Sequence, residues 1–293
     1  MTVQDEIQGY LTSPDILALA EASQKAYGYS LAHLREYCRR RAIHSFDDFQ
    51  SKMPLYAKWL KQERQITDQS VQQHINNVKI FLAWLGHPVE YTYKISNHDK
   101  QAKKRKHSKR WLSENEVAMC LNYSFENSTA TNQIKYRLIV RLLVETGCRA
   151  KELACLTGAE VDIDEQTLYL STSKTEPRPA FFSPDSQGLF SQLKKKKSVW
   201  KGELFPSVER IKQIVNEMLG ELGLKSGKDG RGPHVLRHYI ISHLFFIGGM
   251  RIEEIAALVG DTPQTIQAVY LHCPEMVMRE KISDAMGWEK SSE

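Results

Sequence analysis

The sequence has few cysteines, no long hydrophobic run and no paired metal-ligand motif, and each absence excludes a class of protein. Its five cysteines include no Cys-x-x-Cys pair, so neither a disulfide framework nor a zinc site is expected. No tract of about 20 residues is free of charge, which argues against a membrane-spanning helix. Residues 1–10 lack the basic start and apolar centre of a secretory signal. We therefore expect a soluble cytoplasmic protein with no metal and no membrane partner.

The length and the charge distribution say more than the totals do. At 293 residues the chain exceeds the size at which one core usually keeps growing, so two domains are expected. The net charge is only +5, but basic residues crowd residues 98–110. Such a run extends by self-repulsion and suits a polyanion, although a solvated linker is the alternative. The candidate polyanion contacts in this segment are Lys103, Lys104, Arg105 and Lys106. A second run, Lys194–Lys197, is interpreted as a solvated turn.

Hydrophobic spacing divides the chain on either side of the basic segment. Residues 14–87 carry apolar positions three to four apart in several stretches, so residues 1–97 are predicted to form a compact helical domain. Residues 98–110 are the predicted linker. Residues 111–293 form the second predicted domain, in which a capping box at residues 113–116 opens a helix and a long helical run follows over residues 134–145.

β-forming residues appear only in the second domain. Residues 161–170 and 178–182 predict a small antiparallel sheet of two or three strands, with Lys174 near its turn. Helical patterns resume at 207–222, 235–246, 252–259 and 264–271. The predicted fold class is therefore mainly α with a small antiparallel β-sheet.

Two short motifs place chemically active side chains together. Arg149 and Glu152 are three residues apart, as are His234 and Arg237, so each pair shares a helix face. Two arginines that meet across a cleft can hold the non-bridging oxygens of a phosphate, because the guanidinium fork fits that geometry and stays charged. Taken alone, each pair is also typical of a surface ion pair or a helix cap.

Taken in order, these motifs resemble the signature boxes of the tyrosine recombinases, the family of phage integrases and chromosome-dimer-resolving recombinases. The boxes are residues 146–153 (Thr-Gly-Cys-Arg-Ala-Lys-Glu-Leu), His234-x-x-Arg237-His238, Leu-Val-Gly at 258–260, and Tyr270 followed by His272. The resemblance covers about residues 111–286, and the helical domain before them is similar to the SAM-like core-binding domain of that family. It implies an α+β catalytic domain that binds DNA together with the N-terminal domain.

The resemblance implies a site-specific recombinase or integrase that cuts and rejoins DNA through a 3′-phosphotyrosyl intermediate. Because the covalent link keeps the energy of the phosphodiester, neither ATP nor a metal ion nor another cofactor is required. The roles it implies are Tyr270 as nucleophile, Arg149 and Arg237 as phosphate ligands, His234 as the group that deprotonates or orients the tyrosine, Lys174 as the acid for the leaving 5′-oxygen, and Glu152 as the support of the first arginine.

Asp261 departs from the family pattern, in which a histidine or tryptophan usually follows Leu-x-Gly, nine residues before the nucleophile. An ionised carboxylate cannot donate a hydrogen bond to a phosphate oxygen. Two accounts are open. Asp261 and Gln264 resemble a capping box with Pro263 in the first turn, which favours a helix cap. Alternatively the carboxylate turns into the site, pairs with an arginine and slows cleavage or makes it depend on assembly.

The resemblance also implies partners. These are double-stranded DNA with a specific recombination site, and further copies of the chain, as a dimer on one site and a tetramer in synapsis, with accessory DNA-bending proteins as optional additions. Residues 275–293 are then expected to pack into a neighbouring subunit, the alternative being packing within the chain. Candidate DNA contacts in the N-terminal domain are Arg35, Arg39, Arg40, Arg41, Gln72, Gln73, Asn76, Asn77 and Lys79.

Two other functions remain open from the sequence alone. A type IB topoisomerase-like enzyme would nick and relax DNA without exchanging partners, and relaxation without a recombination product would favour it. A DNA-binding regulatory or accessory protein with a decayed recombinase site would form no covalent adduct with DNA. Asp261 is the residue that raises this last alternative.

Overall fold

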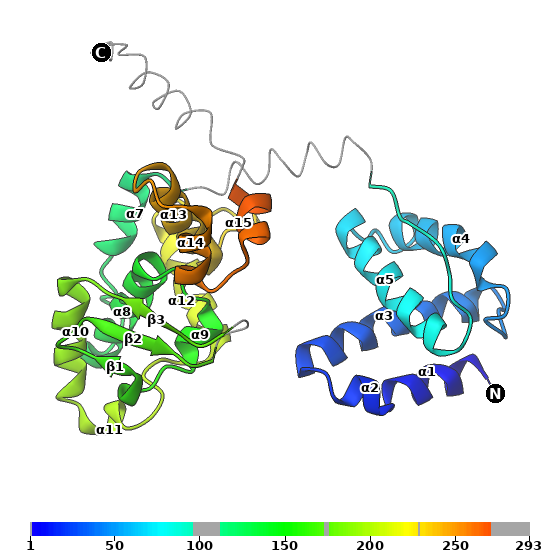
Figure 1. The fold of residues 1–293 in the computed structure, drawn as a ribbon, viewed down its shortest axis with the longest axis horizontal. Helices are drawn as coiled ribbons and strands as arrows, with labels where there is room; N and C mark the ends of the chain where they lie inside the picture. Colours follow the sequence, from blue (N-terminus) through cyan, green and yellow to red (C-terminus); the bar gives the residue numbers. More distant parts are fainter. Residues whose placement is uncertain (1, 96–111, 173–175, 228, 271–293) are drawn as a thin grey trace, which may run out of the picture. The chain divides into compact units, whose positions relative to one another are not determined.

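The computed structural model describes residues 2–95, 112–172, 176–227 and 229–270. Of residues 268–270 it describes only the backbone. These residues form two compact units, one on either side of residues 96–111 (Figure 1). The predicted linker and its basic residues Lys103, Lys104, Arg105 and Lys106 lie outside the described residues, so this domain boundary stays a prediction. None of the described helices combines the length and the apolar character that crossing a bilayer requires.

All the regular secondary structure of the N-terminal unit, over its described residues, is helical. Its apolar side chains lie on the facing sides of α3 and α5, and α1 and α4 pack against this pair. Four fully buried rings fill the centre, among them Phe46 and Phe81, whose centroids are 5.3 Å apart at 88°. The helices are α1 (Val3–Leu11), α2 (Pro14–Leu17), α3 (Glu21–Arg40), α4 (Phe49–Gln62) and α5 (Asp68–Trp84).

The second unit begins with the predicted capping box. Ser113 Oγ accepts a hydrogen bond from the amide of Glu116 at 3.3 Å, and the Glu116 carboxylate accepts from the amide of Ser113 at 2.7 Å. Both amides would otherwise lack partners at the helix start. The helices that follow are α7 (Glu114–Leu121), α8 (Ala130–Glu145), α9 (Ala150–Ala154), α10 (Pro184–Lys194), α11 (Lys197–Trp200), α12 (Val208–Glu221), α13 (Pro233–Phe246), α14 (Ile252–Val259) and α15 (Pro263–Tyr270).

The predicted sheet is present as three antiparallel strands in the order β1-β2-β3. They are β1 (Val161–Asp162), β2 (Thr167–Leu170) and β3 (Arg178–Phe181), after the 3-10 turn η1 (Gly158–Glu160). Leu170 pairs with Arg178 and Thr167 with Phe181. Because side chains alternate along a strand, Arg178 and Ala180 are buried while Pro179 and Phe181 are exposed. The fold class expected from the sequence, mainly α with a small antiparallel sheet, is confirmed.

The core of this unit surrounds α8, which packs against α10, α13 and α12. A second, smaller cluster joins α13, α14 and α15 through Ile241, Ile255, Ala256, Val259 and Ile266. It holds the helix that ends at Tyr270.

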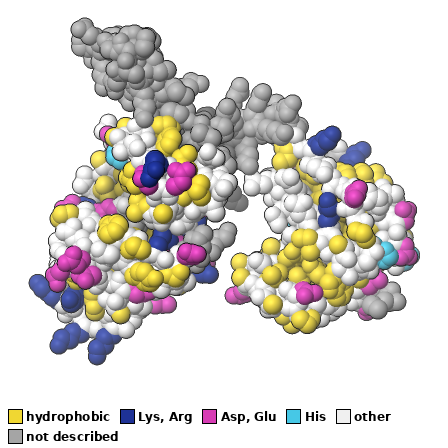
Figure 2. Space-filling model, in the orientation of Figure 1, with side chains coloured by type: hydrophobic (Ala, Val, Ile, Leu, Met, Phe, Trp, Pro, Cys, Tyr) yellow, Lys and Arg dark blue, Asp and Glu magenta, His cyan; other side chains and the backbone are white. Residues whose placement is uncertain are grey.

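The second lysine run is solvated, as the sequence predicts. Lys194–Lys197 join α10 to α11 and are all exposed, and Lys and Arg side chains gather over this corner of the unit (Figure 2).

Candidate active site

The turn between α8 and α9 presents Arg149. Gly147 has a φ of +60°, and a Cβ at this position would come 3.0 Å from the side chains of both Ile240 and Val259. Only glycine adopts this conformation readily and fits this space. The chain therefore turns sharply after α8, and Arg149 is the residue immediately before α9.

Glu152 lies at the centre of a charged cluster below this turn. Its side chain is 1% exposed, and it accepts hydrogen bonds from the Arg149 amide at 2.7 Å and from Arg149 Nη1 at 3.2 Å. Burial raises the pKa of Glu152, but the hydrogen bonds and charges of Arg178 and Arg149 outweigh it and leave the pKa below its ordinary value. Glu152 is thus a buried carboxylate anion that orients Arg149.

Arg178 is the second partner of Glu152 and was not among the predicted site residues. Its Nη1 and Nη2 atoms both donate to the Glu152 carboxylate at 3.1 Å, and its Nε donates to the carbonyl of Leu258 at 2.9 Å. Gly260, with a φ of +65°, lies directly against this guanidinium, since a Cβ there would be 2.3 Å from Nη1. Arg178 therefore links β3, α9 and the end of α14. The signal for it was an arginine at an inward-facing position of a predicted strand.

Arg149 and Arg237 converge on one oxygen atom. Arg237 lies near the start of α13 and is 4% exposed. Its Nη1 donates to the carbonyls of Gly147 and Val259. Arg149 Nη1 donates to the carbonyl of Gly260 at 2.7 Å. With the Nη1 atoms held by backbone, the two Nη2 atoms lie 3.0 Å and 2.9 Å from Asp261 Oδ2. The structure thus brings together the two predicted phosphate ligands.

Asp261 enters the site, and the helix-cap interpretation is wrong. The amide of Thr265 donates to Thr262 Oγ1 at 3.2 Å, so Thr262 caps α15. Within the described part of the chain, Asp261 Oδ1 accepts a hydrogen bond only from the neighbouring amide of Thr262, at 3.1 Å. Two guanidinium groups attract the carboxylate more strongly than a helix start does, because charge-assisted hydrogen bonds are the stronger ones.

His234 lies in the first turn of α13, on the same helix face as Arg237. The residue as a whole is exposed to solvent. Partial burial lowers the pKa of His234, and the charges of Arg237, Arg149 and Lys212 lower it further, against an opposing effect of Asp261. The imidazole is therefore neutral near pH 7, and its unprotonated ring nitrogen can accept a proton.

Tyr270 is placed by its backbone only, and Lys174 is not among the described residues. Tyr270 is the last residue of α15, which packs against α13 and α14, and its side chain is not among the described ones. Lys174 belongs to the connection between β2 and β3 and lies outside the described residues. The same holds for residues 275–293, so their predicted packing into another subunit stays a prediction.

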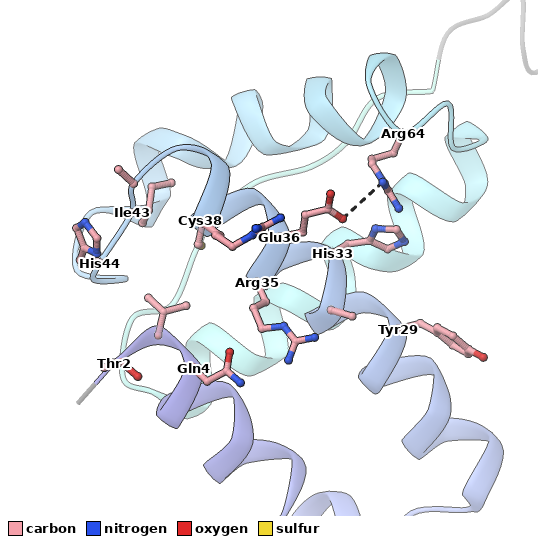
Figure 3. Close-up of a pocket in the computed structure, with 14 residues that line it drawn as sticks. Thr2, Gln4, Tyr29, His33, Arg35, Glu36, Cys38, Ile43, His44 and Arg64 are labelled. Carbon is pink, nitrogen blue, oxygen red and sulfur yellow. Dashed lines mark ion pairs between the residues drawn. The ribbon is translucent and has the colours of Figure 1, made fainter.

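A separate cavity lies within the N-terminal unit. It has a volume of about 950 Å³ and opens between α1 and α3, with Arg35, Arg39 and Arg64 on its wall. Glu36 faces Arg64 across it at 3.5 Å (Figure 3). The candidate DNA contact Asn77 is wrong, because its side chain is 4% exposed and bonded to Ser30 Oγ.

The arrangement in the second unit is suited to an oxyanion. Two guanidinium nitrogens fixed about 3 Å from one oxygen can bind a tetrahedral anion and stabilise additional negative charge on it. Within the residues that the structure describes, no group of three or more His, Cys, Asp or Glu side chains could hold a metal ion.

Comparisons with known proteins identify the family of the chain. The family model described as "Phage integrase family" matches residues 110–275. The chain is 26% identical to the tyrosine recombinase XerA of Saccharolobus solfataricus over 223 residues, which cover 76% of this chain and 69% of that protein.

Two solved structures share the fold. The XerH site-specific recombinase bound to palindromic difH substrate, in a post-cleavage complex, matches with a TM-score of 0.70 at 14% identity, over 89% of this chain and 79% of that chain. A lambda integrase tetramer bound to a Holliday junction matches with a TM-score of 0.63 at 16% identity, over 89% of this chain and 78% of that one.

Proposed function

The chain belongs to the phage integrase family, and we propose on this basis that it is a site-specific tyrosine recombinase that cuts and rejoins DNA through a covalent 3′-phosphotyrosyl intermediate. The observation that carries this function is the convergence of Arg149 and Arg237 on one oxygen beside the helix that ends at Tyr270. Two fixed guanidinium groups stabilise the charge that develops when an oxygen attacks a phosphodiester.

Each site residue has a role in this proposal. Tyr270 attacks the phosphorus atom and forms a phosphotyrosyl bond, while the bond to the 5′-oxygen breaks and Lys174 supplies the proton to that leaving oxygen. The neutral imidazole of His234 accepts or directs the proton of the tyrosine hydroxyl. Glu152, with Arg178, keeps Arg149 in place. A hydroxyl of another strand then reverses the step, so the bond energy is conserved.

The proposed partners are double-stranded DNA and further copies of the chain. The relatives of known structure are bound to a DNA substrate in one case and form a tetramer on a Holliday junction in the other. By analogy, this chain would bind one recombination site as a dimer and join two sites as a tetramer, with Lys103–Lys106 at the phosphates. The cytoplasmic location expected from the sequence is part of the same proposal.

The test is covalent trapping on a nicked duplex that carries the repeats flanking the gene. The native chain is expected to form a protein–DNA adduct, and Tyr270→Phe is expected to form none, because only the phenol oxygen can make the bond. Tyr169→Phe removes an exposed tyrosine of the same unit and serves as the control. Adduct formation that survives Tyr270→Phe would refute the assignment of the nucleophile.

A DNA-binding protein without cleavage activity is the second candidate, and the carboxylate of Asp261 between the two arginines is the observation that favours it. Binding of the repeats with no adduct from the native chain would support this candidate over the first.

A further inference from the structure

Asp261 holds the position that a phosphate oxygen would take. Its Oδ2 lies 3.0 Å from Arg149 Nη2 and 2.9 Å from Arg237 Nη2, which are ordinary lengths for guanidinium–carboxylate hydrogen bonds. A carboxylate and a phosphodiester both offer an anionic oxygen to a guanidinium, so one can replace the other at the same pair of nitrogens.

The two arginines cannot offer this pair of nitrogens in a second place without breaking other bonds. Their Nη1 atoms are bonded to the carbonyls of Gly147, Val259 and Gly260. A phosphate held by both Nη2 atoms must therefore compete with the carboxylate for the same point.

The carboxylate is the member of the group that can leave. The side chain of Asp261 is 19% exposed, that of Arg149 is 20% exposed and that of Arg237 is 5% exposed. The aspartate has two side-chain torsions and stands between Gly260 and the cap residue Thr262, whereas both guanidinium groups are also bonded to backbone carbonyls. Rotation of one short side chain vacates the site without any movement of α13 or α9.

Charge balance favours exchange over simultaneous occupancy. The cluster contains the cations Arg149, Arg178 and Arg237 and the anions Glu152 and Asp261, so its net charge is +1. A phosphodiester, which carries one negative charge, leaves this total unchanged when it replaces the carboxylate. Two anions within a few ångströms of each other on the same arginines would repel.

We propose that the Asp261 carboxylate is an intramolecular substitute for the scissile phosphate, which closes the arginine pair in the DNA-free protein and must be displaced before cleavage. This inference rests on the proposed function for its role in cleavage, but the occupancy of the anion site is a property of the protein alone. It makes cleavage conditional on a DNA site that delivers its phosphate with enough binding energy to expel the carboxylate.

The first experiment uses inorganic phosphate and no DNA. We would measure the thermal unfolding midpoint of the full chain against phosphate concentration for the native protein, Asp261→Asn and Asp261→Ala. Because a ligand that binds only the folded state raises the midpoint, both variants are expected to respond to roughly tenfold lower phosphate concentrations than the native protein does. In the absence of phosphate they are expected to unfold at lower temperature, since the buried Arg237 and the half-buried Arg149 have lost a counter-ion.

The matched control is Asp185→Asn. Asp185 also pairs with an arginine, at 2.8 Å from Arg141 Nη2, but on the surface and outside the site. This variant is expected to respond to phosphate as the native protein does. Equal phosphate responses of the native protein and of both Asp261 variants would overturn the proposal.

The second experiment measures adduct formation on the nicked duplex at subsaturating DNA. Asp261→Asn is expected to form the adduct several-fold faster than the native chain, because no carboxylate has to leave. Slower adduct formation by Asp261→Asn, despite tighter phosphate binding, would contradict the proposed displacement. If no protein forms an adduct, the proposed function fails, while the phosphate titration still decides whether Asp261 fills the anion site.

Discussion

Glu152 and Glu254 occupy the same local position in two helices of very different burial. Each is the third residue of a helix whose preceding residue is an arginine, and each carboxylate accepts the amide of that arginine, at 2.7 Å and 2.8 Å. Glu254 and Arg251 are exposed, whereas Glu152 is buried and also binds Arg178. The pair therefore separates the effect of a buried charge cluster from that of a helix cap.

We expect Glu152→Gln to lower the free energy of unfolding by about 3–5 kcal/mol, because it removes the buried carboxylate that accepts hydrogen bonds from both Nη atoms of the buried Arg178. Glu254→Gln is expected to cost much less, since its ion pair is exposed and screened by solvent. Denaturant unfolding of both variants checks the difference. Similar losses of unfolding free energy for the two variants would mean that the buried charge cluster contributes no stability beyond that of a helix cap.

At the scale of single residues, the sequence predicted side chains that belong to short spaced motifs. Arg149, Glu152, His234 and Arg237 were identified because their motifs resemble the signature boxes of the family, and the spacing within one helix turn indicates which of them share a face. The sequence left two positions open for Asp261, because its capping pattern is local, whereas the two arginines that attract it come from segments 112 and 24 residues away. No local pattern contains that information.

At the scale of elements, capping residues and strand alternation were informative. The capping box at Ser113 and the alternation around Leu168 and Ala180 appear in the structure where they were predicted. Helix α10 was missed, although Ser183 and Pro184 form a typical helix start. The pairing of α3 with α5 was also outside what the sequence could predict, because it depends on contacts between distant segments.

The α3–α5 interface contains a buried polar group that makes the N-terminal unit sensitive to acid. Ser30 Oγ lies 2.9 Å from His74 Nδ1 and accepts from Asn77 Nδ2 at 2.9 Å. Burial, with a smaller effect of His33, lowers the pKa of His74 to about 4 from an ordinary value of 6.5. The unfolded chain therefore binds this proton at higher pH than the folded unit does.

It follows that the stability contributed by neutral His74 is complete above pH 6.5 and declines as the pH falls toward 4. We expect a loss on the order of 1 kcal/mol after allowance for solvent screening. His74→Gln is expected to flatten this part of the pH dependence in denaturant titrations, and His44→Gln, which changes an exposed histidine of the same unit, is not. An unchanged slope for His74→Gln would show that other groups control the acid response.

At the scale of the whole molecule, the two units have separate hydrophobic cores. No residue of the cluster that contains Leu34 belongs to the cluster that contains Leu138, and both side chains are fully buried. Two domains were expected from chain length alone, and the position of the boundary depended on the composition of residues 98–110.

We expect Leu34→Ala to destabilise the N-terminal unit by about 2–5 kcal/mol through the cavity it leaves, and to leave the unfolding of the second unit unchanged. Leu138→Ala is expected to do the reverse. Calorimetry of the two variants checks this, because separate cores give separable transitions. A single transition that shifts as one in both variants would instead indicate one cooperative molecule.

Backbone carbonyls accept hydrogen bonds from the Nη1 atoms of Arg149 and Arg237. This arrangement affects which substitutions the site can tolerate in evolution. Every amino acid supplies the same carbonyl, so substitution of the surrounding side chains leaves these acceptors in place, provided that Gly147 and Gly260 remain glycine. The geometry of the two proposed phosphate ligands is thereby largely independent of those side chains, whereas the neighbouring position 261 acts through its side chain and can change. Substitution of Asp261 can therefore change the proposed displacement step without changing the backbone that holds the two arginines.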